Sequence, residues 1–189
     1  MTIFRMIKKV LLLVFMFSLM QLNGQDKLSR YDLQLGIGKV FYESNMQPIN
    51  FVQPEANFRI ADHFTTNISL DFAPYNAGEH DYRFFLSSKV NLLYSPFGNY
   101  KKNDFRFGAG LTYYVHLRTY ADEYSSNGII ELPSHYRTVL TPGTLGYNIS
   151  IEDEYRIWNL LIFGVKAFSS FYFDGKYMPG ITVKAGILL

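Results

Sequence analysis

The sequence of 189 residues contains no cysteine, one tryptophan and four histidines. The absence of cysteine excludes disulfides, thiolate metal sites and cysteine nucleophiles. A domain of this size must then be stabilised by packing and hydrogen bonding, or by a membrane.

An excess of basic charge is also missing, although the formal net charge is +2. The first 24 residues hold three basic residues and no acidic residue, which leaves 15 basic against 16 acidic residues in the rest. No basic stripe remains to attract phosphates, so nucleic-acid binding is not expected. Disorder is not expected either, because 48% of the residues are hydrophobic and 17% are aromatic.

The N-terminal segment has the pattern of a secretory signal peptide. Three basic residues precede an apolar run from Val10 to Met20, and small or polar residues follow up to Gly24. A basic start, a short apolar stretch and a small residue at the end are typical of such peptides. We expect residues 1–24 to be a cleaved signal peptide and residues 25–189 to form one domain. The alternative is an uncleaved membrane anchor.

From residue 31 onward, apolar and polar residues alternate with a period of two, which indicates β-strands with two unlike faces. Leu33, Leu35 and Ile37 share one face of the first such segment, and Gln34 and Gly36 share the other. Eight segments show this alternation: 31–42, about 52–61, 64–73, 82–94, 105–116, about 143–152, about 159–171 and 177–189. Most are close to the roughly 9–11 residues that a tilted strand needs to cross a bilayer.

The connections between these segments alternate in length. One set is short or medium (61–63, 95–104 and 153–158), and the other is longer on average (43–51, 74–81, 117–142 and 172–176). Outer-membrane barrels show this asymmetry between periplasmic turns and outer loops. The sequence therefore predicts an all-β fold, a closed eight-stranded antiparallel up-and-down transmembrane β-barrel, with both termini on the short-turn side.

The glycines indicate which face points inward. The more polar face carries Gly36, Gly38, Gly108, Gly110, Gly146, Gly164, Gly180 and Gly186. Glycine on a water-facing strand surface weakens the strand, whereas glycine inside an eight-stranded barrel makes room in a narrow interior. We therefore expect the polar face to line the lumen and the Leu, Ile, Val and Phe face to contact lipid.

This orientation places many charged residues in the lumen. We expect a lumen charge network of Asp32, Glu55, Arg59, Asp71, Arg83, Lys89, Arg106, Glu152, Lys166 and Lys184. Charges inside a barrel must pair or stay hydrated. Two readings remain open, a salt-bridge network that fills the lumen and a narrow water-filled ion path.

From about Tyr31 to Leu189 the chain resembles the family of small eight-stranded outer-membrane β-barrel proteins, which includes outer-membrane protein A-like barrels. The last strand keeps the alternation of the family in Ile181, Val183, Ala185 and Ile187, but Leu189 replaces the usual terminal aromatic residue. The resemblance implies a location in the outer membrane of a Gram-negative-type bacterium. It also implies contact with membrane lipid and insertion by the outer-membrane assembly machinery.

The sequence offers no convincing catalytic, cofactor or metal site. Lipid A deacylases among such barrels resemble one another in a His-x-Ser pair, and no histidine here has serine two positions later. His116 is expected to be a hydrogen-bonded interior residue, and consecutive ligands such as Glu79, His80 and Asp81 rarely converge on one ion. We expect a non-enzymatic barrel with a structural or surface-interaction role. The alternatives are a lipid A-modifying enzyme and a soluble periplasmic lipocalin-like ligand carrier.

The connection from Leu117 to Pro142 is the best candidate for contact with a partner. Asn127-Gly128 is a strong tight-turn signal, which predicts a hairpin that extends the fifth and sixth strands. The candidate partner-contact residues are Tyr120, Tyr124, Ile129, Ile130 and Tyr136. The alternative is a hairpin that folds on itself and contacts nothing specific.

Overall fold

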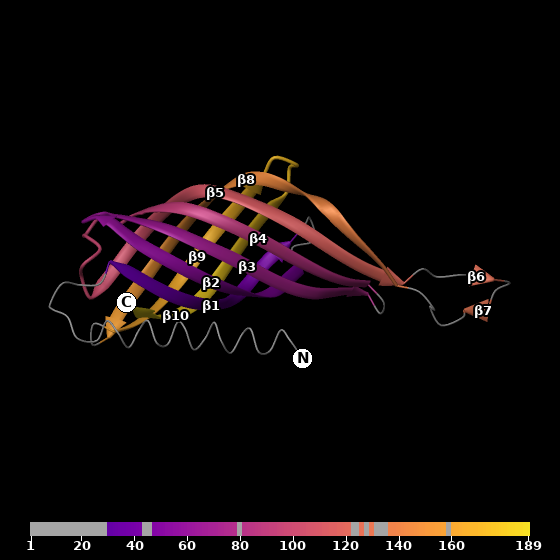
Figure 1. Ribbon diagram of the computed structural model, residues 1–189, viewed down its shortest axis with the longest axis horizontal. Helices are drawn as coiled ribbons and strands as arrows, with labels where there is room; N and C mark the ends of the chain where they lie inside the picture. Colours follow the sequence, from indigo (N-terminus) through magenta and orange to yellow (C-terminus); the bar gives the residue numbers. More distant parts are fainter. Residues whose placement is uncertain are drawn as a thin grey trace.

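The computed structural model describes residues 30–42, 47–78, 81–121, 125–126, 129–130, 136–157 and 160–189. Eight strands form the barrel: β1 (Tyr31–Tyr42), β2 (Gln47–Ala61), β3 (Phe64–Gly78), β4 (Asp81–Tyr94), β5 (Asn103–Ala121), β8 (Tyr136–Ile157), β9 (Leu161–Tyr172) and β10 (Tyr177–Leu188). Their order is β1-β10-β9-β8-β5-β4-β3-β2 (Figure 1). The predicted closed eight-stranded antiparallel barrel is confirmed.

Closure comes from the pairing of the first strand with the last, in which Leu35 lies opposite Ala185 and Ile37 opposite Val183. Each of the other barrel pairs joins two barrel strands that are consecutive along the chain, β8 being the next barrel strand after β5. We call the end with the 62–63 and 95–102 connections the turn end, and the opposite end the loop end. Among the described residues, no helix has the length and hydropathy to cross a bilayer.

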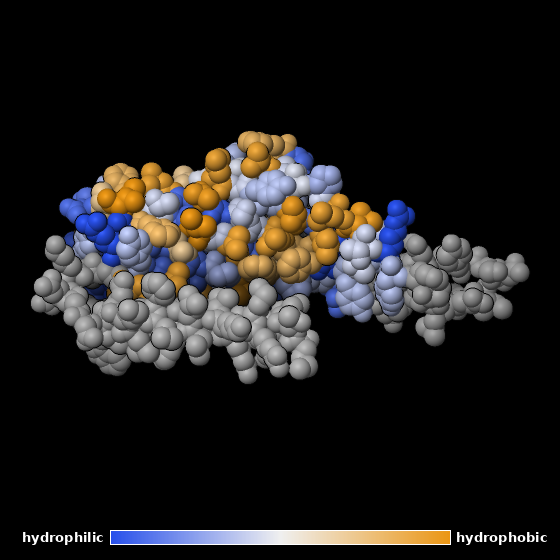
Figure 2. All heavy atoms as spheres, in the orientation of Figure 1, coloured by the Kyte–Doolittle hydropathy of each residue, from blue (hydrophilic) through white to orange (hydrophobic). Residues whose placement is uncertain are grey.

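The alternating side chains point as the glycine positions predicted. Leu35 and Val183 are 53% and 64% exposed on the outside, and Ile68 and Phe107 are exposed with them. The intervening polar side chains are buried inside the barrel. Hydrophobic residues accordingly cover the middle of the visible barrel surface, and hydrophilic ones gather toward its ends (Figure 2).

Several strands extend farther at the loop end than the alternation predicted. β3 continues to Gly78, β5 to Ala121, and β8 begins at Tyr136, so most of the predicted 74–81 loop and parts of the 117–142 loop are strand. The alternation stops there because neither face of the extension is buried: β8 is exposed throughout its first seven residues. At the turn end, β8 continues to Ile157 and shortens the predicted 153–158 turn.

The predicted hairpin is present at the loop end, where β5 and β8 stay paired up to Ala121 and Tyr136. Farther along it, β6 (Ser125–Ser126) and β7 (Ile129–Ile130) form a separate antiparallel pair (Figure 1). The Asn127-Gly128 dipeptide lies outside the described residues.

The inward glycines allow close packing inside the barrel. A Cβ atom at Gly180 would lie 2.5 Å from Cζ of Phe168, and one at Gly36 would lie 2.6 Å from the Thr182 hydroxyl. Both distances are too short for non-bonded atoms. Glycine at these positions therefore lets larger interior side chains cross the narrow lumen.

Candidate functional site

Inside the barrel, the described residues include a balanced set of buried charges, which we call the charge network. Its acidic members are Asp32, Glu55, Asp71, Asp104, Glu152 and Glu154. Its basic members are Arg59, Lys89, Arg106, Arg156, Lys166 and Lys184. Six carboxylates thus face six cations, and each cation has a carboxylate oxygen within 2.9 Å.

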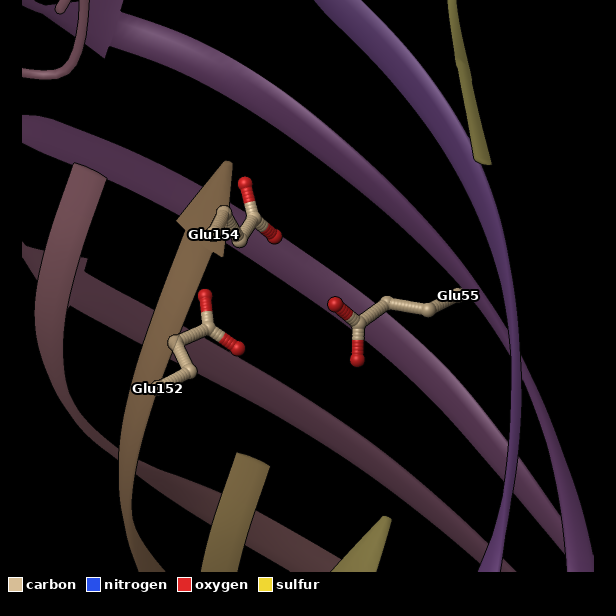
Figure 3. Close-up of side chains that lie close together, drawn as sticks. All are labelled: Glu55, Glu152 and Glu154. Atoms are coloured by element: carbon tan, nitrogen blue, oxygen red, sulfur yellow. The ribbon is translucent and has the colours of Figure 1, made fainter. Parts of the chain in front are cut away.

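Lys184 lies at the centre of the densest part of this network. Its Nζ atom is 2.7 Å from Glu152, 2.8 Å from Glu154 and 2.9 Å from Glu55. The three carboxylates come from β2 and β8 and point toward one another (Figure 3). Their oxygens lie within 4.8 Å of one another, a spacing that would suit a metal ion. The Lys184 ammonium already supplies the positive charge at that position.

Arg106 connects the network to the turn end of the barrel. Its guanidinium contacts Asp104 at 2.6 Å, Glu154 at 2.9 Å and Glu152 at 3.1 Å. Arg156 shares Asp104 at 2.9 Å. Because the fixed fork of an arginine side chain matches several oxygens at once, these contacts hold β5 and β8 in register.

Amide side chains connect the charge network to the strands around it. Asn57 donates a hydrogen bond of 2.7 Å to Asp32, which Arg59 also contacts at 2.8 Å. Asn67 donates to Asn57 at 2.8 Å, and Asn91 donates to Asn67 at 2.9 Å. A hydrogen-bonded row therefore crosses β2, β3 and β4, as buried polar groups require.

A second interior cluster is apolar, and we call it the apolar layer. It contains Val40, Ile49, Phe51, Ala73, Phe85, Tyr114, Phe168, Tyr172 and Met178. This layer lies on the loop-end side of the charge network: Phe85 comes before Lys89 on β4, which begins at the loop end, and Met178 comes before Lys184 on β10. The interior thus has two stacked parts of opposite character.

Nine of the ten predicted lumen residues belong to the charge network, and Arg83 does not. It lies on the loop-end side of Phe85, where its partly exposed side chain contacts Asp81 at 2.8 Å. Asp81 also binds Arg118 at 2.8 Å. Arg83 shares the inward face of β4 with Phe85 and Lys89, but Phe85 lies between the two cations, so the alternation alone did not bring Arg83 into the charge network.

The structure adds Asp104, Glu154 and Arg156 to the predicted network. All three continue the alternation of the fifth and sixth predicted segments beyond the ends assigned to them. Extending 105–116 by one residue and 143–152 by four would have found them, because the inward positions recur every second residue.

Two polar contacts lie at the loop-end side of the apolar layer. Tyr114 donates a hydrogen bond of 2.5 Å to Asp174, and Lys176 contacts both groups. His116, as expected, is an interior residue near the loop end, and it shares a hydrogen bond of 3.2 Å with the Tyr75 hydroxyl. Among the residues of the predicted Glu79-His80-Asp81 trio, only Asp81 is described.

The predicted contact residues fall in different parts of the hairpin. Tyr136 is 55% exposed at the start of β8, and the Tyr120 ring is covered by the Arg118 guanidinium at 4.9 Å. Ile129 and Ile130 form β7, and Tyr124 lies outside the described residues.

Comparisons with known proteins identify the fold. No protein-family model and no curated protein sequence matches the chain. Among solved structures, Ail, the attachment invasion locus protein of Yersinia pestis, is 8% identical, with a TM-score of 0.57 over 85% of this chain and 99% of that one. The likeness at this low identity is one of fold.

Two further solved structures are similar. Neisserial surface protein A is 12% identical, with a TM-score of 0.60 over 85% of this chain and 98% of that one. A major outer membrane protein from Thermus thermophilus is 12% identical, with a TM-score of 0.61 over 85% of this chain and 99% of that one. This chain therefore shares its barrel architecture with bacterial surface and outer-membrane proteins.

Proposed function

We propose that this chain is a non-enzymatic outer-membrane β-barrel with a closed lumen and a surface-interaction role. The observation that carries the proposal is the inverted distribution of side chains: a neutral set of charges is buried inside, and large apolar side chains are exposed outside. Exposed apolar surface on this scale is unfavourable in water. Lipid is the environment in which it is stable.

The backbone satisfies the other requirement of a membrane. Hydrocarbon offers no hydrogen bonds, so a spanning sheet must close on itself, and the β1–β10 pairing closes this one. Even the shortest barrel strands have 12 residues, which exceeds the roughly 9–11 residues needed to cross. The surface and outer-membrane proteins with the same fold support an outer-membrane location.

The interior side chains favour a sealed barrel rather than a water-filled ion path. Each cation of the charge network has a close carboxylate partner, and the apolar layer blocks the loop-end side. An apolar constriction excludes ions by excluding water. A soluble lipocalin-like carrier is disfavoured for the same reason, because its ligand would need the space that these side chains fill.

The β5–β8 hairpin supports a surface-interaction role. Between Tyr136 and Thr144, β8 pairs with β5 on one side and, among the described residues, with no strand on the other. Tyr136, Val139 and Leu140 are exposed there. A free strand edge with exposed β-forming side chains is a template for contact with another protein. One structural neighbour is described as an attachment invasion protein, which agrees with this role.

The hydrogen bonds of the two described histidines do not support the lipid A-modifying alternative. His63 contacts the backbone carbonyl of Ser95 at 2.7 Å, and His116 contacts the Tyr75 hydroxyl. Neither contact pairs a histidine with a serine hydroxyl, which such hydrolysis needs as nucleophile and base.

Cell fractionation tests the membrane proposal. We expect the protein in outer-membrane fractions, resistant to carbonate extraction and with heat-modifiable migration in detergent. Recovery in the soluble periplasmic fraction would contradict the proposal. For the surface role, binding of intact cells to host matrix or to other cells is compared with and without residues 125–128. Unchanged binding in the deletion strain, with equal surface amounts of both proteins, would remove the hairpin from the proposal.

A further inference from the structure

The outer wall of the barrel contains a groove across β5, β8, β9 and β10. Its volume is about 490 Å³, and its outward side chains are Phe107, Ile149, Ile151, Ala167, Ser169 and Pro179. This volume is in the range of small-molecule sites, roughly 300–1,000 Å³. The groove lies on the outside of the barrel, and Phe168 of the apolar layer is the member of the two interior clusters that lines it.

The groove exists because two consecutive outward residues of β9 are small. Ala167 lies opposite Ile151 of β8, and Ser169 lies opposite Ile149. On the other flank, Ser169 lies opposite Pro179 of β10. Larger residues precede and follow the small pair on the same face of β9, Val165 on one side and Phe171 on the other. The result is a trough that follows β9.

The outward side chains that line the groove favour an apolar ligand. No charged side chain lines the groove. The Ser169 hydroxyl already lies 3.4 Å from the Tyr177 hydroxyl. The remaining outward groups are hydrocarbon, so the occupant must be apolar along its whole length.

The width of the groove selects among apolar occupants. Neighbouring strands are about 4.8 Å apart, so β8 and β10 are separated by roughly 10 Å, and their side chains fill much of that distance. A helix with its side chains is about 10–12 Å wide and does not fit. A single extended hydrocarbon chain does.

An aromatic row closes the loop-end side of the groove. The ring of Phe171 stacks on Tyr147 at 5.0 Å and lies 4.9 Å from the ring of Tyr177. Tyrosines of membrane proteins concentrate at the headgroup level. The row thus places the loop-end side of the groove next to lipid headgroups and the rest among acyl chains.

We propose that this groove is a binding site for one acyl chain of a membrane lipid in the loop-side leaflet. The proposal rests on the membrane orientation argued above. The acyl chain follows β9 over Ser169 and Ala167, and its ester end lies beside the Tyr147–Phe171–Tyr177 row. A lipid held in this way dissociates more slowly than the other lipids around the barrel.

Native mass spectrometry of the barrel released from palmitoyl-oleoyl phosphatidylcholine nanodiscs tests this site. We expect the wild-type barrel to keep one lipid at collision energies that remove all others. A167L/S169L, which fills the groove, is expected to lose that lipid. A167V adds two methyl groups and provides a milder variant should the double variant fold poorly.

Ala185→Leu is the matched control, because Ala185 is also a small outward residue but does not line the groove. It is expected to keep the lipid. Equal retention by wild type, A167V and A167L/S169L overturns the site, as does a wild-type barrel that inserts normally and keeps no lipid. Failure of the wild-type protein to enter nanodiscs would instead contradict the membrane proposal.

Discussion

The Nζ atom of Lys89 lies 3.5 Å from the centre of the Phe168 ring, at the boundary between the charge network and the apolar layer. The same ammonium is 2.6 Å from Asp71. A cation over an aromatic face is attracted by the ring quadrupole. Phe168 is a member of the apolar layer, and in this way it stabilises Lys89, the cation of the charge network that lies next to that layer. The two interior parts therefore meet without a water-filled gap being needed to hydrate Lys89.

Lys184→Met is expected to destabilise the barrel by about 3–5 kcal/mol, because it leaves Glu55, Glu152 and Glu154 with one cation fewer in a buried site. The midpoint of urea unfolding in lipid vesicles measures the change. Adding Glu152→Gln to Lys184→Met restores charge balance and should recover part of the loss.

Lys102→Met is the matched control for Lys184→Met. Lys102 is exposed at the turn end, where it lies over the Tyr155 ring at 5.1 Å. Removing an exposed charge there should change stability by no more than about 0.5–1 kcal/mol. Equal effects of the two substitutions would mean that the charge network contributes no special stability.

Gly180→Ala is expected to cost about 1–3 kcal/mol, because the new methyl group would overlap the Phe168 ring. Phe168→Ala alone should cost more, about 3–5 kcal/mol, by leaving a cavity. In the Phe168→Ala background the Gly180→Ala cost should disappear, and a double-mutant cycle measures this coupling. An additive cycle would show that the ring does not require the glycine.

The sequence alone predicted the closed barrel and its orientation, because period-two alternation and inward glycines are local signals. It missed the apolar layer for the same reason. Phe85 and Phe168 are large apolar residues on the otherwise polar face of their strands, and only the closed barrel shows that they meet the inward Phe51 and Met178. Contacts between strands that are distant in sequence leave no mark on the pattern of any one strand.

The charge network was predicted in part. Alternation tells which residues point inward but not how far along the axis each one lies. Arg83 was therefore grouped with Lys89, although Phe85 lies between them on β4 and separates Arg83, at the loop end, from the charge network. Partners were equally hidden: Lys184 reaches Glu55 although 129 positions separate them.

The Tyr114–Asp174–Lys176 contact at the β9–β10 turn should contribute pH-dependent stability. Burial raises the pKa of Asp174, but hydrogen bonds from Tyr114 and Lys176 outweigh burial and hold it below the ordinary value of 3.8. A depressed pKa means that the stabilisation is complete above pH 3.8 and is lost as the pH falls through the lower value of the folded state.

Asp174→Asn should therefore lower the free energy of unfolding near neutral pH. The difference in this free energy between the variant and wild type should become smaller as the pH falls below 3.8, because wild type then loses the charge of Asp174. Comparing the two proteins isolates this group, because the buried carboxylates of the charge network are present in both. Unfolding curves of the two proteins at several pH values measure the difference. A constant difference across the acid range would show that Asp174 is not the titrating group.

Planar-bilayer recordings test whether the charge network and the apolar layer each block the passage of ions through the lumen. We expect no stepwise conductance from the wild-type barrel. One double variant, Phe85→Ala/Phe168→Ala, removes bulk from the apolar layer but keeps the charge network. The other, Glu152→Ala/Lys184→Ala, opens the charge network but keeps the apolar layer. Neither double variant should conduct, because each keeps one of the two obstacles. The quadruple variant removes both obstacles and should conduct, provided that heat-modifiable migration shows a folded barrel. Conductance in the wild type would mean that water already passes both parts, and the closed-lumen proposal would then fail.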